Sequence, residues 1–312
     1  MGTNGNPVSD YDVVIVGAGA AGLNAALLLA RARRQVAVVD SGQPRNAPAA
    51  HMHGFLTRDG ISPADFLEAG RAEVLGYGAR LIDGRVDTVA GSAGGSFTVR
   101  LGSGETLYAR SILVATGLHD ELPDVPGVRE RWGRDVVHCP YCHGYEFRDQ
   151  SIGVLGTSPG AVFHAQLIRQ WSADVVLFAH TLDLSTEDRD RLEARGVSVV
   201  DGPVARVIVD DDAVRGVELA EGATVARSAV FVVPRMVPND SLLTDLGCAV
   251  ENGWVSVDRA GATSVPGVYA AGNVTDPRAQ VVTAAGVGSA AGFAINLDLV
   301  DKDIAGALAA VS

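Results

Sequence analysis

The chain has 312 residues, of which 47% are hydrophobic and 20% are charged, and this balance predicts a soluble globular protein of about two domains. Its net charge is −12 and its pI is near 4.9, so we expect no nucleic acid partner, because an acidic surface repels phosphate groups. We also expect no membrane partner, because Lys302 is the sole lysine and no basic cluster stands out.

Residues 1–10 lack the basic start and the apolar run of a signal peptide, so the expected compartment is the cytoplasm. A close cysteine pair in a reducing compartment is more often catalytic than structural. The third cysteine, Cys248, stands alone, and we expect it to be a small buried core residue.

The first predicted elements are a strand over residues 12–16, a glycine turn, a helix over residues 23–33 and a strand over residues 35–39. This order is typical of a doubly wound α/β sheet.

The turn, Gly17-Ala18-Gly19-Ala20-Ala21-Gly22, fits the GxGxxG pattern. Gly17 permits the tight turn, Gly19 lets the backbone approach a pyrophosphate, and Gly22 allows helix and strand to pack closely. Asp40 ends the next strand, where a carboxylate can bind ribose hydroxyls. These residues predict a dinucleotide site, and the alternative is a tight structural turn.

Residues 43–60 lack clear periodicity and carry His51 and His53, which is typical of a long functional loop whose histidines are candidates to line a site. A helix over residues 63–77 and several strands follow. We predict an α/β protein with two Rossmann-like domains. The first contains residues 1–117 and 239–312, and residues 118–238 form an inserted second domain.

The second domain repeats the opening, with a strand over residues 152–155, a turn from Gly156 and a strand over residues 174–178. Ser158 replaces the middle glycine of this turn, and a side chain there crowds the backbone where a pyrophosphate must approach. His180 follows the next strand, and no arginine stands there to hold a 2′-phosphate. The sequence therefore predicts that nicotinamide binding has been lost.

Before that turn lies Cys139-Pro140-Tyr141-Cys142, with His138 before it and His143 after it. Two thiols at this spacing can close and reopen a disulfide, and a helix start would lower their pKa values. A zinc site and an inert pair are the alternatives, although the two histidines are too close in sequence to surround one ion. His143 is the first candidate base and His138 the second, and Glu146 is a candidate to orient His143.

Near its end the chain carries Ala271-Gly272-Asn273, and then Gln280-Val281 before an Ala-rich and Gly-rich helix. Such a helix start can direct backbone N–H groups at an anionic group.

Together these segments resemble the low-molecular-weight thioredoxin reductase family over essentially the whole chain. The resemblance implies FAD in the first domain, a redox disulfide in the inserted domain and a homodimer. The candidate FAD-binding residues are Gly17, Gly19, Ala20, Ala21, Gly22, Asp40, Ala115, Thr116, Gly117, Gly272, Asn273, Gln280 and Val281.

The sequence departs from the reductases at Ser158, at His180, at His143, where they carry an acid, and at Asn273, where they carry an aspartate. Residues 138–146 are similar to the FAD-dependent dithiol oxidases of natural-product pathways. These relatives of thioredoxin reductase close disulfides in small molecules such as gliotoxin and the dithiolopyrrolone holomycin, and they pass the electrons to oxygen.

The resemblance implies a dithiol oxidase that acts on a small-molecule dithiol, such as a dithiolopyrrolone, and reduces O2 to H2O2. A substrate thiolate would attack Cys139, and Cys142 would lie next to the flavin. We expect no metal. The alternatives are a thioredoxin reductase-like enzyme fed by NADPH or another donor, and a non-enzymatic redox sensor.

Overall fold

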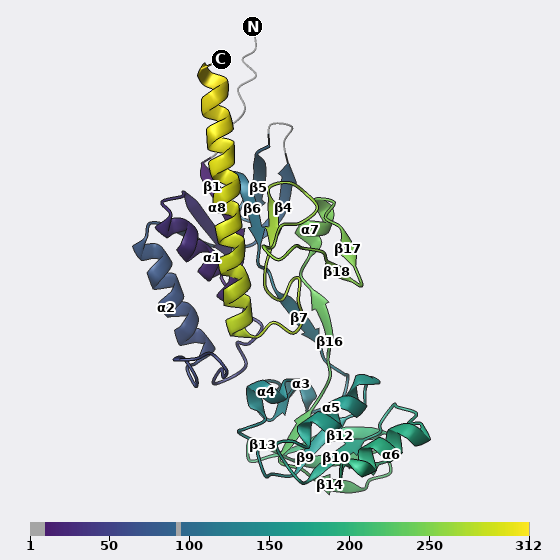
Figure 1. Ribbon diagram of the computed structural model, residues 1–312. Helices are drawn as coiled ribbons and strands as arrows, with labels where there is room; N and C mark the ends of the chain where they lie inside the picture. The colour runs from purple at the N-terminus through teal and green to yellow at the C-terminus, as the bar shows by residue number, and fades with distance from the viewer. Residues whose placement is uncertain (1–9, 92–94, 312) are drawn as a thin grey trace. The chain divides into compact units, whose positions relative to one another are not determined.

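A computed structural model describes residues 10–91 and 95–311, and these residues divide into two compact units, each described here by itself (Figure 1). The first unit contains the described residues up to Arg45, Pro63–His119 and the residues from Val237 onward. The second unit contains Asn46–Ser62 and Asp120–Met236. The loop Asn46–Ser62 lies inside the predicted first domain, yet it groups with the second unit because its contacts are there.

A mainly parallel sheet forms the centre of the first unit and confirms the predicted α/β class. The strand order is β3-β2-β1-β6-β5-β4, with β19 also beside β6. The buried strands β1 and β2 are almost continuously apolar, as a parallel sheet covered on both faces requires. The strands are β1 (Tyr11–Val16), β2 (Val36–Asp40), β3 (Arg80–Asp83), β4 (Val86–Gly91), β5 (Phe97–Leu101), β6 (Thr106–Val114) and β19 (Val268–Ala270).

Helix α8 (Val281–Val311) packs along α1 (Ala20–Arg31), as Figure 1 shows. The approach is close because α8 presents small residues. A Cβ atom at Gly288 would lie 2.1 Å from the backbone oxygen of Ala21, and one at Gly292 would lie 3.1 Å from that of Ala25. The start of α8 is thereby held beside the turn that precedes α1. The remaining elements of this unit are α2 (Pro63–Gly76), α7 (Ser241–Asp245), β17 (Val250–Glu251) and β18 (Trp254–Val255).

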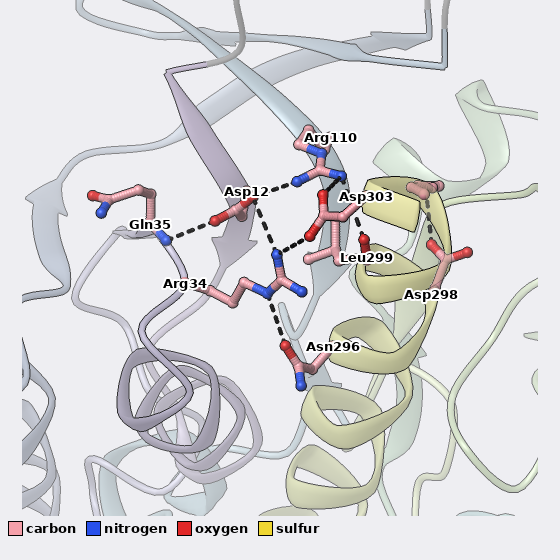
Figure 2. A network of polar contacts seen from close by, with 9 residues as sticks. Asp12, Arg34, Gln35, Arg110, Asn296, Asp298, Leu299 and Asp303 are labelled. Atoms are coloured by element: carbon pink, nitrogen blue, oxygen red, sulfur yellow. Dashed lines mark hydrogen bonds and ion pairs between the residues drawn. The ribbon is translucent and has the colours of Figure 1, made fainter. Parts of the chain in front are cut away.

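A network of ion pairs fixes the C-terminal half of α8 to the sheet (Figure 2). Asp303 accepts hydrogen bonds from Arg34 and Arg110, and Arg110 also binds Asp12 of β1 at 2.8 Å. Arg34 Nε donates to Asn296 Oδ1 at 2.8 Å. By length and composition α8 is apolar enough to cross a membrane, but this network and its packing on α1 are what a helix of a folded domain shows.

The second unit has a parallel sheet in the order β11-β10-β9-β15-β8 and an antiparallel sheet in the order β12-β13-β14. Phe178 and Phe231 are fully buried in its core. The chain passes between the units at β7 and at β16, which pair with each other. The elements are β7 (Leu118–Glu121), α3 (Val128–Arg131), β8 (Val136–Val137), α4 (Pro140–His143), β9 (Ile152–Leu155), α5 (Gly160–Ile168), β10 (Val175–Phe178), α6 (Thr186–Ala194), β11 (Ser198–Val200), β12 (Val204–Asp210), β13 (Ala213–Leu219), β14 (Thr224–Ala226), β15 (Ala229–Phe231) and β16 (Arg235–Pro238).

Candidate active site

Cys139 and Cys142 form a disulfide at the start of α4, with their Cα atoms 5.2 Å apart. Cys139 is the N-cap residue, and its carbonyl oxygen accepts from the N–H groups of Cys142 and His143 at 3.2 and 3.1 Å. Pro140 occupies the first helical position, where a missing N–H group costs nothing. The short helix therefore holds both sulfurs at bonding distance, so that the pair can alternate between disulfide and dithiol.

The zinc interpretation has no support from the described residues. A disulfide leaves neither sulfur as a thiolate ligand. In the part of the chain that the structure describes, no group of three or more His, Cys, Asp or Glu side chains is placed to hold a metal. Cys248 is buried in the core of the first unit, and burial raises the pKa of its thiol, which confirms its prediction as a core residue.

The residue before the disulfide, His138, is held from two sides by the second unit. Its Nδ1 donates to the carbonyl oxygen of Val232 at 3.0 Å. Its ring stacks on that of His164, with centroids 5.3 Å apart and the planes at 4°. His164 Nε2 also donates to the carbonyl oxygen of His138 at 2.8 Å. These contacts fix the backbone that leads into Cys139.

His164, on α5, is a site residue that the sequence motifs missed. Burial and, to a smaller extent, the nearby His138 lower its pKa to about 4, although the hydrogen bond to the His138 carbonyl opposes both effects. The imidazole is therefore neutral at pH 7. A signal was present in the sequence: His164 shares one buried helical stripe with Ala161, Ala165 and Ile168, and a polar residue on such a stripe needs a partner.

His143, the first candidate base, directly follows Cys142 at the end of α4. Burial lowers its pKa below the ordinary 6.5, the carboxylate of Glu146 opposes that shift, and His53 adds to it. A neutral imidazole next to a cysteine can accept a proton from a thiol. His138 remains the second candidate, although its Nδ1 is already engaged by a carbonyl group.

The long loop brings one of its two histidines to this segment. His53 Nε2 lies 3.4 Å from Glu146 Oε1, and His53 Nδ1 lies 3.3 Å from Asp59 Oδ2. His51 instead bonds the carbonyl oxygen of Gly60, within the loop itself, at 3.0 Å. The close partner of Glu146 is thus His53, whereas the sequence predicted His143, which Glu146 influences through charge.

The glycine turn between β1 and α1 has the shape that a pyrophosphate needs. Gly17 has φ +103°, and a Cβ atom there would lie 2.5 Å from the oxygen of Ala115. A Cβ atom at Gly22 would lie 1.9 Å from the oxygen of Gly17, whereas one at Gly19 would meet no protein atom within 4 Å. The chain is therefore closely packed behind the turn and open above it. Backbone N–H groups of Ala20 and Gly22, in the first turn of α1, can bind phosphate oxygens there.

The carboxylate of Asp40 has two protein partners. Its Oδ1 accepts from the N–H group of Ala18 at 3.0 Å, and its Oδ2 forms an ion pair with Arg71 of α2. Arg71 holds the acid at the end of β2, where it was predicted to meet ribose hydroxyls. The motif spacing carried no signal for this arginine, because it comes from a helix 31 residues further along the chain.

Two further predicted segments adjoin the turn. Ala115 follows β6, and its N–H group donates to the carbonyl oxygen of Val16 at 2.8 Å. Thr116 Oγ1 donates to the carbonyl oxygen of Asn239 at 2.7 Å, and Asn239 Nδ2 donates to that of Thr116 at 3.0 Å. Gly117 follows with φ +68°, which favours glycine.

Gly272 follows β19 and lies against α1, because a Cβ atom there would be 3.1 Å from the Cβ of Ala21. Asn273 Nδ2 donates to the carbonyl oxygens of Asp276 and Ala279 at 2.9 and 3.0 Å, so its Oδ1 is left to accept a hydroxyl group. Gln280 and Val281 lead into α8.

All the predicted FAD-binding residues thus lie in the first unit, most of them at the carboxyl ends of the neighbouring strands β2, β1, β6 and β19. Ligands of doubly wound sheets bind at such an edge. The open glycine turn and the free Asn273 oxygen fit the phosphates and hydroxyls of FAD.

The second turn, between β9 and α5, is built differently. Gly156 is required by packing, since a Cβ atom there would lie 2.6 Å from the oxygens of Phe178 and Ala179. The hydroxyl of Ser158 lies at the start of α5, 3.7 Å from the Cβ position of Gly160. His180 is half-buried and accepts from the N–H group of Val204 at 2.9 Å, so it holds the start of β12.

Comparison with known proteins places these features in a family. Residues 11–288 match the family described as pyridine nucleotide-disulphide oxidoreductase. The chain is 32% identical to thioredoxin reductase sirT of Leptosphaeria maculans, over 95% of this chain and 97% of that protein. It is similar to the crystal structure of HlmI, with a TM-score of 0.95 and 63% identity over 98% of both chains. It is also similar to a putative thioredoxin reductase, TrxB, from Bacillus anthracis, with a TM-score of 0.90 and 33% identity over 94% of this chain and 99% of that one.

Proposed function

The chain belongs to the pyridine nucleotide-disulphide oxidoreductase family and is an FAD-binding oxidoreductase, and from that premise we propose that it oxidises a small-molecule dithiol to a disulfide. In this proposal the first unit binds FAD and the second unit is the redox domain. The observation that carries the proposal is His143, a half-buried histidine directly after Cys142 whose pKa is lowered by burial. The reductases that the chain resembles have an acid at this position.

The disulfide of Cys139 and Cys142 is the oxidant of the substrate. His143 takes the proton of one substrate thiol, and the resulting thiolate attacks the sulfur of Cys139, so that Cys142 leaves as a thiolate. The second substrate thiol then attacks the substrate sulfur of this mixed disulfide. Cys139 leaves, and the substrate departs as a closed disulfide. Two electrons and two protons have passed to the protein, which now carries a dithiol.

FAD, when bound, supplies the two-electron acceptor that returns the dithiol to the disulfide, and O2 is the proposed final acceptor, giving H2O2. The residues of the second unit hold the sulfurs and move protons during this cycle. The contacts of His138 with His164 and Val232 keep the backbone of Cys139 fixed while its sulfur changes partners. The proposed substrate class includes dithiolopyrrolones, on the resemblance of residues 138–146 to the dithiol oxidases.

The second candidate function is a disulfide reductase that draws electrons from NADPH or another donor. The name thioredoxin reductase on several relatives favours it. Against it stands the hydroxyl of Ser158 at the start of α5, at the place where a nicotinamide dinucleotide would bring its pyrophosphate. A homodimer in the cytoplasm is proposed for either function.

Anaerobic mixing of the FAD-loaded protein with dithiothreitol and, separately, with NADPH decides between the two functions. We expect dithiothreitol to bleach the flavin absorbance and NADPH to leave it nearly unchanged, because the second turn is obstructed. Admission of O2 should restore the absorbance and produce H2O2 in proportion to the dithiol consumed. Rapid bleaching by NADPH would instead establish the reductase.

A further inference from the structure

The carboxylate of Glu146 is shared between two histidines that come from distant parts of the chain. His53 Nε2 lies 3.4 Å from Glu146 Oε1, close enough for an ion pair when the imidazole is protonated. His143, three residues before Glu146, feels the same carboxylate through charge. A carboxylate that pairs with one histidine is less able to stabilise a proton on the other.

The loop holds His53 firmly in this place. Met52 is buried, and the loop closes by hydrogen bonds from the N–H group of Met52 to Ile61 and from that of Gly60 to Met52, both at 2.9 Å. The N–H group of Gly54 donates to Asp59 Oδ1 at 2.8 Å, and Asp59 Oδ2 meets His53 Nδ1. Only 23% of the His53 side chain is exposed, so its orientation is set by the fold.

The beginning of the loop is anchored to the same unit. A Cβ atom at Gly133 would lie 2.6 Å from the Cβ of Pro48, so the loop packs directly on the chain just before β8. From β8 the chain runs into the disulfide segment. His53 and Glu146 are thus carried by segments that pack on each other at the beginning of the loop.

The charged and titratable groups that face His53 are Asp59 in its own loop and, in the disulfide segment, Glu146 and His143. Glu146 alone would favour a proton on His143. A protonated His53 cancels part of the Glu146 charge and repels a proton on His143, so both of its effects act in the same direction.

We propose that His53 is a positioning residue which binds the carboxylate of Glu146 and thereby keeps His143 neutral and able to take a proton from a thiol. The proposal deepens the proposed function, because it rests on His143 as the base of dithiol oxidation. The interaction itself exists whether or not the protein oxidises dithiols, and this makes the two separable by experiment.

The direct test is the titration of His143 by NMR in the FAD-loaded protein labelled with [13C]histidine. The chain has seven histidines, and the His143 signal is identified by its loss in His143→Gln. We expect His53→Gln to raise the titration midpoint of His143 by about half a pH unit, because glutamine keeps the size of the side chain without its charge. An unchanged or lowered midpoint would overturn the proposal.

Two other variants sharpen the result. His51→Gln is the matched control, because His51 belongs to the same loop but bonds Gly60, and it should leave the midpoint unchanged. Glu146→Gln should lower the midpoint, and His53→Gln added to it should shift His143 by less than it does in the wild-type protein. A midpoint that rises or stays in Glu146→Gln would refute the role of Glu146, even if His53→Gln folds poorly.

The pH profile of dithiol oxidation separates this inference from the proposed function. His143 must be deprotonated to act as a base. The acid limb of the pH–rate profile should therefore move to higher pH in His53→Gln by the same amount as the NMR midpoint of His143. A midpoint that moves while the profile stays fixed would leave the His53 interaction intact and remove His143 from the base role.

Discussion

Replacing His164 with glutamine should make the stability of the protein less dependent on pH between 7 and 5. Burial lowers the pKa of His164 to about 4 in the folded protein, whereas the ordinary value of 6.5 applies to the unfolded chain. Between these values the unfolded state binds a proton that the folded state does not. Above pH 6.5 this difference in proton binding costs no stability. As the pH falls from 6.5 to 4, it progressively lowers the free energy of unfolding.

The size of the effect follows from these two values. Lowering the pH from 7 to 5 should cost the wild-type protein about 1.5–2 kcal/mol of unfolding free energy through this one group. Glutamine does not titrate in this range, so the variant should not lose this part of its unfolding free energy between pH 7 and 5. At pH 7 the variant should be less stable by about 1 kcal/mol, because it lacks the stacked ring against His138. The difference between the two proteins should therefore shrink or reverse at pH 5.

Urea unfolding followed by tryptophan fluorescence measures this difference, with both proteins saturated with FAD. Trp132 and Trp171 report on the second unit, in which His164 lies, and Trp254 belongs to the first. The exposed His51, changed to glutamine, is the control and should keep the wild-type pH dependence. A His164→Gln protein that loses as much stability between pH 7 and 5 as the wild type would refute the reasoning.

Further changes test the sulfurs, the base and the glycine turn. Cys139→Ser and Cys142→Ser should each abolish dithiol oxidation while the protein keeps its FAD. Cys139→Ser should show a long-wavelength charge-transfer band, whereas Cys142→Ser should trap the substrate as a mixed disulfide. The reverse pattern would exchange the roles of the two sulfurs. His143→Ala should slow turnover by about 10²–10⁴-fold, and less at high pH, where thiols ionise unaided; near-normal turnover with an unchanged pH profile would contradict it. Gly22→Val should lower the melting temperature of the apoprotein, because its Cβ atom would lie 1.9 Å from the Gly17 oxygen. Gly19→Val should reduce the flavin absorbance and leave the melting temperature unchanged. Equal melting temperatures in the two variants would argue against a turn that is packed at Gly22 and open at Gly19.

The sequence predicted the elements whose signals are local. The apolar runs of β1 and β9 and the glycines that follow them specify strand, turn and helix within about 20 residues, so the α/β class and the place of the first turn could be predicted. The start of α4 at the disulfide also agrees with a local pattern, because Pro140 occupies the first helical position.

Such local signals do not predict contacts between distant segments of the chain. Arg71 reaches Asp40 from α2, and His164 reaches His138 from α5, and neither pair shares a periodic pattern. The grouping of Asn46–Ser62 with the second unit depends on where the folded loop packs, which periodicity does not encode. The sequence therefore indicated His143, Glu146 and His53, whose contacts lie near the disulfide, but it gave no sign of Arg71 or His164 as long-range partners.

The place of β19 and α8 in the first unit has a consequence for biosynthesis. The sheet that carries the first glycine turn is completed by β19, which pairs with β6, and by α8, which covers α1, and both come from Val268 onward. A ribosome delivers the whole of Asp120–Met236 earlier. We therefore expect the inserted unit to fold during translation, while the nascent flavin unit stays incomplete, with residues 112–114 of β6 still lacking β19 as a partner. Chaperone binding should concentrate on that interval, and flavin loading should be one of the last events in maturation.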